Sequence, residues 1–419
     1  MKNRIFFFLF VLLQFGQHVY CQDTTYARTL MLTLGSPAYG GRGYVGNGNR
    51  KAAGFIANQF IEDGLSHYGL DYLQEFNFPI NTIQYVDNII VDEDTLMAGI
   101  DFYIANASQT TKGNFKLLDI NDSLFRLNKK YRDSILGLKN SKKYFLVFHH
   151  SNHKIRFALN NKVAGLIFLH SKHLPPWEFS HAQNPVNYAI VDIVAERFPA
   201  NSTSITLDFT SKFYPHFPTQ NVVAFEKGSL CPDSFLVIGA HYDHMGKMGQ
   251  SVIFPGGNDN LSGTAMLLNL ARYFSQHPQK YSLVFMSFSG EEVGLLGSTY
   301  FINHPLINLK KIKFMLNIDM VGTGSKGIVV VNGSIFKNKF KLMTAINAKE
   351  NYLPKVKVRG EACNSDHCPF YRKGVPSFFI YTTGDEYREY HSPMDLPQSV
   401  PLTNYNGVFR LIRDFIQQQ

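Results

Sequence analysis

From Asn221 to the C-terminus the sequence alternates apolar runs with helical stretches, and this rhythm constrains the fold more than any other feature. The runs at residues 234–240, "SFLVIGA", and 282–288, "SLVFMSF", are continuously apolar apart from small residues. Such runs are typical of strands covered on both faces. Residues 261–274, "LSGTAMLLNLARYF", have helical character and lie between them. The pattern predicts an α/β fold with a largely parallel sheet between layers of helices.

Residues 85–213 have a different character and predict a smaller inserted domain, α/β or β-rich. Short apolar runs such as residues 144–148, "YFLVF", alternate there with Lys- and Asn-rich stretches. These stretches do not gather the acids and histidines expected of a reactive centre. The main domain is then expected to comprise residues 22–84 and 214–419.

Residues 1–21 have the features of an export signal. Lys2 and Arg4 precede an apolar run that is too short to span a bilayer comfortably, and Val19 and Cys21 fit the small-residue positions of a cleavage site. Cys21 as a lipid-attachment site is disfavoured by the bulky Tyr20 before it. We therefore expect a periplasmic or extracellular protein with no stable membrane span in the mature chain, since no later run is apolar enough.

Composition excludes some classes of partner. The chain has 419 residues, 45% of them hydrophobic and 17% charged, which is ordinary for a protein with a large core. Its net charge of +9 comes from scattered lysines without a long basic run, so no nucleic-acid partner is expected. Cys363 and Cys368 in "CNSDHC" could close a short disulfide loop or contribute to a metal site, and their spacing alone does not decide which.

Acids and histidines follow the predicted strands, at the points where those strands end. They are His241, Asp243, Glu291, Glu292, Asp319 and His391, and Asp259 lies in a loop ahead of a helix. Taken singly, each has a structural explanation; Asp259, for example, could cap that helix. Because open α/β sheets bind ligands at the carboxyl ends of their strands, the joint placement instead favours one functional site at a single sheet edge.

The residue types at this edge suit a pair of metal ions. A catalytic zinc typically has three protein ligands plus water. If one carboxylate bridges two ions, five side chains provide six contacts: His241, Asp259, Glu292, Asp319 and His391. Three carboxylates and a shared hydroxide would also balance two Zn²⁺, as a buried site requires. We therefore predict two Zn²⁺ per chain, although these ligands do not exclude cobalt or manganese.

Glu291 and Asp243 remain without a metal in this scheme. Adjacent residues at a strand end point in different directions, so Glu292 can bind metal while Glu291 faces the water. Glu291 is then the candidate general base and acid. Asp243 lies two residues beyond His241 and projects to the same side, where it could orient the imidazole.

At these residues the chain resembles the co-catalytic di-zinc exopeptidases of the M28 metallopeptidase family, which includes secreted bacterial leucyl aminopeptidases. The matching motifs, in order, are "HYDH", "GGNDNLSG", "SGEE", "NIDMVG" and "HSPMD", with the early segment "GGRGYVGNGNRKAAGFIANQF". The resemblance implies a mixed, mainly parallel sheet sandwiched by helices and an inserted protease-associated domain. It implies one zinc on His241 and Asp319, another on Glu292 and His391, and Asp259 as the bridge.

The resemblance also implies peptide substrates and an aminopeptidase activity, with Glu291 as general base and acid and Asp243 behind the first histidine. Alternatives are a carboxypeptidase, a single-zinc glutaminyl cyclase that transfers acyl groups, and an inactive binding protein. The glutaminyl cyclases build their pocket with tryptophan, whereas the single tryptophan here, Trp177, lies outside the matching segment. "SDHCPF" resembles a segment near the family's substrate cleft and would serve either the pocket or the fold. The sequence leaves the oligomeric state open.

Overall fold

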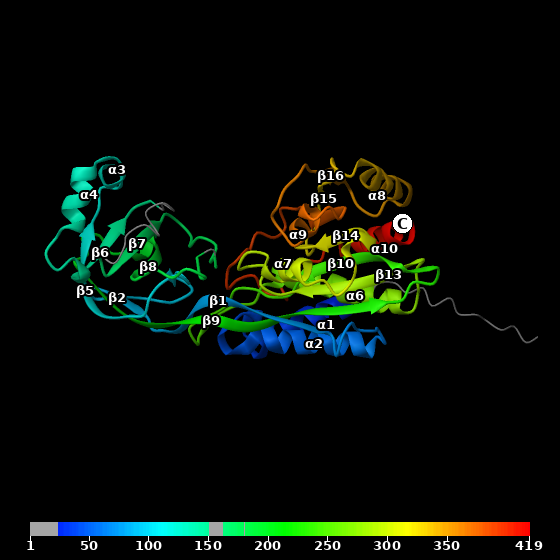
Figure 1. Ribbon diagram of the computed structural model, residues 1–419. Coiled ribbons are helices and arrows are strands. Elements are labelled where there is room, and N and C mark those ends of the chain that lie inside the picture. The colour runs from blue at the N-terminus through cyan, green and yellow to red at the C-terminus, as the bar shows by residue number, and fades with distance from the viewer. Residues whose placement is uncertain (1–23, 151–161, 180) are drawn as a thin grey trace, which may run out of the picture.

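The computed structural model describes residues 24–150, 162–179 and 181–419 (Figure 1). The predicted export signal, residues 1–21, lies outside these residues. Among the described helices, none is both long and apolar enough to cross a membrane.

Four parallel strands form the centre of the sheet that carries the site. They are β10 (Cys231–His241), β13 (Tyr281–Phe288), β14 (Ile312–Ile318) and β17 (Ser377–Thr382), in the order β17-β14-β10-β13. Ile238 of β10 pairs with Phe285 of β13 on one side and Leu316 of β14 on the other. Because the four strands run in the same direction, their carboxyl ends lie at one edge.

Antiparallel strands flank this centre and make the sheet mixed. At one side, β9 (Ser204–Glu226) pairs with β13, and β1 (Leu73–Val86) pairs with β9. At the other side, β15 (Ile328–Val331) pairs antiparallel with β17 and parallel with β16 (Val356–Val358). The prediction of a mixed, mainly parallel sheet is confirmed for this part of the chain.

Helices cover both faces of the sheet. One face packs against α1 (Thr24–Leu34), α2 (Gly48–Glu62), α6 (Gly263–Ser275), α8 (Lys337–Glu350) and α10 (Tyr405–Gln417), and the other against α7 (Leu296–Asn303) and α9 (His367–Arg372). In β10, Leu236 and Ile238 belong to the first core, while Val237 belongs to the second. This double burial explains why the strands are apolar without alternation.

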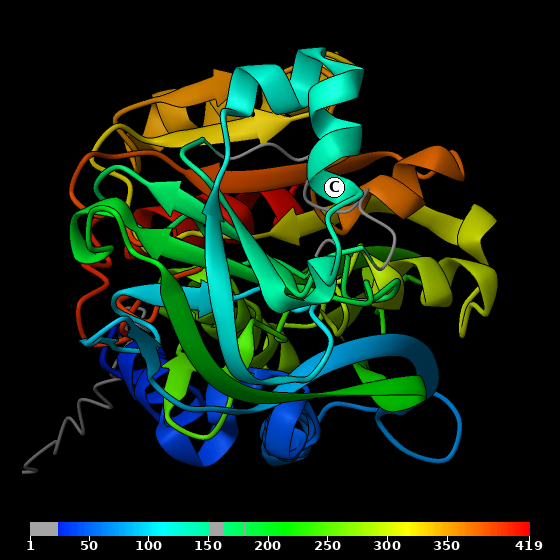
Figure 2. The same cartoon turned by 90° about the vertical axis from the view of Figure 1, so that its left-hand side faces the viewer.

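The sheet continues from β9 into a second lobe (Figures 1 and 2). Its strands are β2 (Ile89–Val91), β3 (Asp94–Leu96), β4 (Phe102–Ile104), β5 (Thr111–Asp119), β6 (Tyr144–Phe148), β7 (Gly165–His170) and β8 (Ala189–Val194), and its helices are α3 (Asp122–Leu127) and α4 (Lys129–Leu136). Strands β5 to β8 run parallel, and Phe125, Phe148 and Phe168 join a core of their own.

Strands β1 and β9 belong to both lobes. Both extend from the main sheet along the second lobe, where β9 also pairs with β2 and β5. Residues 85 and 213, the predicted limits of the insert, therefore fall within continuous strands. The division into domains stays a prediction, since the two lobes share these strands.

Short elements connect the strands near the site. They are the 3₁₀ turns η1 (Pro37–Arg42) and η2 (Val45–Asn47), the hairpin β11 (Gly246–Met248) and β12 (Val252–Phe254), and the π-helical turn η5 (Gly257–Ser262). Further 3₁₀ turns are η3 (Ser141–Lys143), η4 (Ala195–Arg197) and η6 (Leu309–Lys311). The hairpin and η5 connect the end of β10 to the start of α6.

Candidate metal centre

The ends of the four parallel strands position the candidate site. His241 is the last residue of β10, and Asp319 directly follows β14. Glu291 and Glu292 lie in the turn after β13, and His391 lies in the segment after β17. Asp259 reaches the same place from η5. The structure thus brings together every residue predicted for the site.

A tight turn places the two glutamates at the end of β13. Gly290 has a φ of +74°, a conformation that favours glycine, and its carbonyl accepts a hydrogen bond from the backbone N of Leu296 at 2.8 Å. The carbonyl of Glu291 accepts from the backbone N of Gly294 and of Leu295, both at 2.9 Å. The chain therefore reverses within a few residues and brings both glutamates to the site, where a carboxylate oxygen of each lies within 4.8 Å of the other and of a ring nitrogen of His241.

The first group of potential ligands surrounds His241. Its Nε2 lies 3.3 Å from Oδ1 of Asp259 and 3.3 Å from Oδ1 of Asp319. All three side chains are buried. The other ring nitrogen, Nδ1, lies 3.2 Å from the backbone carbonyl oxygen of Asp243, which favours an Nδ1–H tautomer and leaves Nε2 free to bind a cation.

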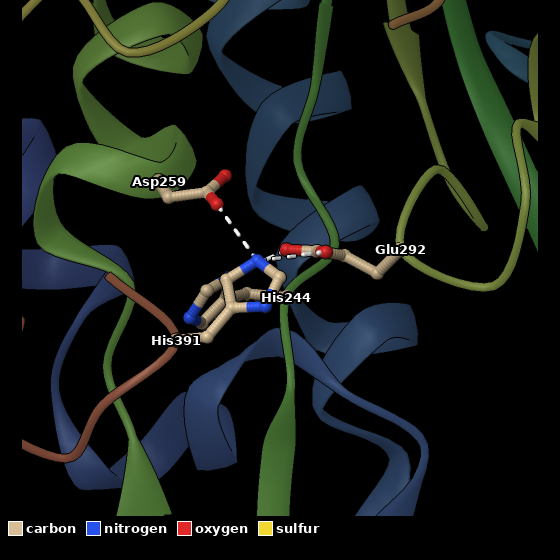
Figure 3. Close-up of side chains that lie close together, drawn as sticks. All are labelled: His244, Asp259, Glu292 and His391. Atoms are coloured by element: carbon tan, nitrogen blue, oxygen red, sulfur yellow. Dashed lines mark hydrogen bonds and ion pairs between the residues drawn. The ribbon is translucent and has the colours of Figure 1, made fainter. Parts of the chain in front are cut away.

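The second group surrounds His391 (Figure 3). Its Nε2 lies 3.0 Å from Oδ2 of Asp259 and 3.2 Å from Oε2 of Glu292. Asp259 therefore directs one carboxylate oxygen to each imidazole. This geometry is what a carboxylate bridging two cations requires.

His244 completes this second group, and sequence reasoning missed it. Its Nδ1 lies 2.8 Å from Oε1 of Glu292, and its ring centre lies 5.5 Å from that of His391 (Figure 3). The side chain is fully buried, and among the described residues its Nε2 has no hydrogen-bond partner. The motif "HYDH" contained the signal, but only its first histidine and its aspartate were assigned.

The side chain of Asp243 makes other contacts than the one predicted with the imidazole of His241. Its carboxylate oxygen Oδ1 lies 3.8 Å from Nδ1 of His241 and accepts a hydrogen bond from the backbone N of Glu291 at 3.3 Å. Its Oδ2 accepts one from the hydroxyl of Tyr44 at 2.7 Å. The carboxylate thus fixes the glutamate turn, while the Asp243 backbone carbonyl contacts the imidazole. Tyr44 is a further residue that the sequence did not reveal.

Other hydrogen bonds hold the ligands in place. The carboxylate of Asp395 accepts from the backbone N of Asn258 at 2.8 Å and of Asp259 at 3.2 Å. The hydroxyl of Ser365 donates to Oδ2 of Asp319 at 2.9 Å and accepts from the side-chain amide of Asn317 at 2.8 Å. Such contacts fix the orientation of potential metal ligands.

Opposite charges dominate the electrostatics of the two groups. Burial alone would lower the pKa of His241 and His391, but Asp319 for the first and Glu292 for the second, among other acids, raise both pKa values well above the usual range. Burial alone would raise the pKa of the acids Asp259 and Glu292. The histidines instead hold the pKa of Asp259 well below its usual range and that of Glu292 at about 2. These carboxylates are ionised and require positive charge next to them.

Glu291 titrates in the opposite direction from Glu292. Burial raises its pKa well above the usual range, and the carboxylates of Glu292 and Asp366 add to this rise while His241 opposes it. Burial also raises the pKa of Asp366, to about 7. Glu291 therefore has the higher proton affinity of the adjacent pair, a property expected of a residue that exchanges protons.

These donors fit divalent metal ions. The imidazoles of His241 and His391 each face two carboxylate oxygens, and Asp259 is shared by both groups. Within the described residues, potential ligand atoms of His241, Asp259 and Asp319 lie within 4.8 Å of one another, as do those of His244, Asp259, Glu292 and His391. Imidazole and carboxylate ligands in this number suit zinc.

The second lobe contacts the loops that carry the site. The backbone N of Trp177 donates to the carbonyl oxygen of His391 at 3.1 Å, and the indole stacks on Phe254 with ring centres 4.5 Å apart. The side-chain amide of Gln183 donates to the carbonyl of Val293 at 3.3 Å, next to Glu292. Trp177 is 3% exposed, so it packs between the lobes and does not line an open pocket.

The segment "SDHCPF" lies behind the site. Cys363 and Cys368 form a disulfide with a Cα–Cα distance of 4.9 Å. The enclosed loop carries Ser365, the hydrogen-bond partner of Asp319. His367 is fully buried and its Nε2 lies 2.8 Å from the carbonyl oxygen of Ala362. The sequence left open whether this segment serves the pocket or the fold. His367 serves the fold, whereas Ser365 contacts a potential metal ligand.

Comparison with known proteins finds a family domain. Residues 221–416 match the model of Peptidase family M28. It is 29% identical over 253 residues to aminopeptidase YwaD of Bacillus subtilis, covering 57% of this chain and 54% of that one. It is 32% identical over 193 residues to the probable leucine aminopeptidase 2 of Aspergillus oryzae, covering 44% of this chain and 37% of that one. The matched segments thus span about half or less of these relatives.

Solved structures confirm the fold. BSAP, a zinc aminopeptidase from Bacillus subtilis, superposes with a TM-score of 0.71 at 20% identity, over 94% of this chain and 95% of that one. A peptidase M28 precursor from Shewanella amazonensis gives a TM-score of 0.68 at 15% identity, over 95% and 93% of the two chains. The second lobe is included in both superpositions, because they cover nearly the whole chain.

The burial of His367 predicts a pH dependence of stability. Burial lowers its pKa from 6.5 to about 4, so on acidification the unfolded chain binds this proton first. The contribution is present above pH 6.5 and is lost as the pH falls towards 4, on the order of 3 kcal/mol in all. His367→Gln should remove this part of the slope when metal-free protein is unfolded in urea at several pH values. The exposed His173→Gln should keep it; an unchanged slope in His367→Gln would contradict the assignment.

Proposed function

We propose that the protein is a metal-dependent exopeptidase, specifically an aminopeptidase that removes N-terminal residues from peptides. One observation carries the proposal: Asp259 directs its two oxygens to His241 and His391, while a carboxylate oxygen of Glu291 lies within 4.8 Å of ligand atoms of His241 and Glu292. The match of residues 221–416 to a peptidase family and the aminopeptidase relatives support the reaction class.

Two zinc ions per chain form part of this proposal. His241 and Asp319 would hold one ion, Glu292 and His391 the other, and Asp259 would bridge them. When bound, the ions supply Lewis acidity that polarises the scissile carbonyl and lowers the pKa of water. His244 contacts Glu292 and so orients the carboxylate that would hold the second ion.

Glu291 would move the proton in the reaction. Hydrolysis adds water across the amide bond: the water oxygen bonds to the carbonyl carbon, and the nitrogen leaves as an amine after gaining a proton. Glu291 accepts a proton from the attacking water and later delivers it to the leaving nitrogen. Asp243 accepts a hydrogen bond from the backbone N of Glu291 through its Oδ1 and so fixes the backbone position from which the Glu291 side chain extends. Peptides with a free N-terminal amine are the proposed substrates.

The organisation of the chain around this site is also proposed. Residues 22–84 and 214–419 would form the catalytic domain, and residues 85–213 a protease-associated-like insert. The contacts of Trp177 and Gln183 with the loops of His391 and Val293 support a role of this insert beside the substrate path. Residues 1–21 would direct export to a periplasm or the extracellular space.

A panel of reporter substrates tests the activity. Aminoacyl reporters with a free amine should be hydrolysed, and the same compounds with an acetylated amine should not. Removal of metal with a chelator should abolish the hydrolysis, and added Zn²⁺ should restore it. Equal hydrolysis of the blocked compounds, or full activity after chelation, would contradict an aminopeptidase.

Glu291→Gln tests the proton carrier. The amide keeps the shape of the side chain but does not accept the proton, so kcat should fall by about 10²–10⁴. Metal content should stay the same, because Glu291 is not among the proposed ligands. Glu75→Gln, at an exposed pair with Arg50, serves as the matched control. Full turnover by metal-loaded Glu291→Gln would refute this role.

Asp259→Asn tests the bridge. We expect wild-type protein to retain two equivalents of zinc after dialysis, measured by elemental analysis. The variant should retain less than one equivalent, because both groups of ligands lose a charged oxygen. Asp233→Asn, at an exposed position, should keep both ions. Two retained ions in Asp259→Asn would show that this residue does not bridge them.

A further inference from the structure

Arg42 is a buried charge whose role the proposed reaction does not explain. It lies in "GGRG", residues 40–43, about two hundred positions before the first site histidine. Its side chain is 0% exposed, although an isolated charge is costly to remove from water. Among the described residues it has no carboxylate within ion-pair distance.

The guanidinium of Arg42 donates to three backbone carbonyl groups. Nε donates to Tyr242 at 2.7 Å, Nη1 to Pro255 at 2.5 Å and Nη2 to Gly256 at 3.1 Å. All three nitrogens are therefore engaged. Hydrogen bonds from a charged donor are stronger than neutral ones, and the planar fork fixes the relative position of its acceptors.

These three acceptors belong to the two loops that bring the ligand groups together. Tyr242 lies between His241 and Asp243. Pro255 and Gly256 begin the loop that leads to Asp259. Nε2 of His241 and Oδ1 of Asp259 are only 3.3 Å apart, so a small shift of either loop would change the spacing of the ligands.

Close backbone packing brings Arg42 into the interior. A Cβ on Gly41 would lie 2.3 Å from the carbonyl oxygen of Phe254, and one on Gly43 would lie 2.4 Å from Cα of Gly246. Only glycine allows the segment to lie this close to the hairpin β11–β12. Arg42, between these two glycines, therefore lies against the loops that carry His241 and Asp259.

We infer that Arg42 is a positioning residue that sets the distance between the loops of His241 and Asp259 and so the metal affinity of the site. The inference rests on the proposed metal centre. A fixed cation repels divalent metal ions, so the charge of Arg42 by itself would weaken their binding. Its contribution to affinity must come from the geometry of its three hydrogen bonds.

The charge of Arg42 should weaken metal binding, whereas its hydrogen bonds should strengthen it. Variants that separate these two effects test the inference. Arg42→Met removes both the charge and the hydrogen bonds, whereas Arg42→Lys keeps the charge and loses the planar fork. Arg413→Lys is the control, because Arg413 in α10 donates to the carboxylate of Asp414 and to the hydroxyl of Tyr352, in elements without proposed ligands. Zn²⁺ affinity of metal-free protein is measured by competition with a chromophoric chelator, and melting temperature is measured in parallel.

We expect Arg42→Lys and Arg42→Met each to weaken Zn²⁺ binding about 10–100-fold. Arg413→Lys should lose thermal stability without losing affinity. Wild-type affinity in Arg42→Lys, or tighter binding in Arg42→Met, would overturn the inference and leave the proposed function standing. If Arg42→Met does not fold, Arg42→Lys decides. Failure of the wild-type protein to bind Zn²⁺ would overturn the proposed function as well.

Discussion

The concentration of buried negative charge at one sheet edge is the constraint on which this structure depends. Asp259, Glu292 and Asp319 are gathered within a few ångströms, with Asp243 and Glu291 next to them. Like charges away from water are unfavourable unless positive groups are placed among them. The imidazoles of His241 and His391 meet this need in part, and divalent cations would meet the rest. The surrounding loops serve mainly to maintain this arrangement.

The parts of the site that could be predicted from the sequence are those that follow from sheet topology. Parallel strands end at one edge, so residues just after them, such as His241 and Asp319, must meet there. Helix α6 was likewise recognisable from the sequence of residues 261–274. By contrast, Tyr44 contacts Asp243 across 199 positions. Such contacts depend on how whole layers pack, which local patterns do not encode.

His244 and the second lobe illustrate other limits of prediction. The number of ligands needed for two ions was already complete without His244, so nothing in that count required it. Residues 85–213 carry no clustered acids and histidines, so nothing in their sequence indicated a contact with the site, yet Trp177 contacts His391 through its backbone N. A main-chain donor has no residue-type signature. The contact depends on how the two lobes lie relative to each other, an arrangement that Figure 1 shows.

Strands β1 and β9 give the second lobe a particular mechanical character. A lobe joined by flexible linkers can open and close like a lid, but this one stands on a two-stranded ribbon paired from Leu73–Val222 to Val86–Phe209, with register shifts between Phe78 and Ile80 and between Ile83 and Tyr85. A paired ribbon is stiffer than a single-chain linker, and it bends mainly at such irregularities. The second lobe is therefore held next to the loops of His391 and Val293, and its position beside the candidate site depends on the pairing of β1 with β9.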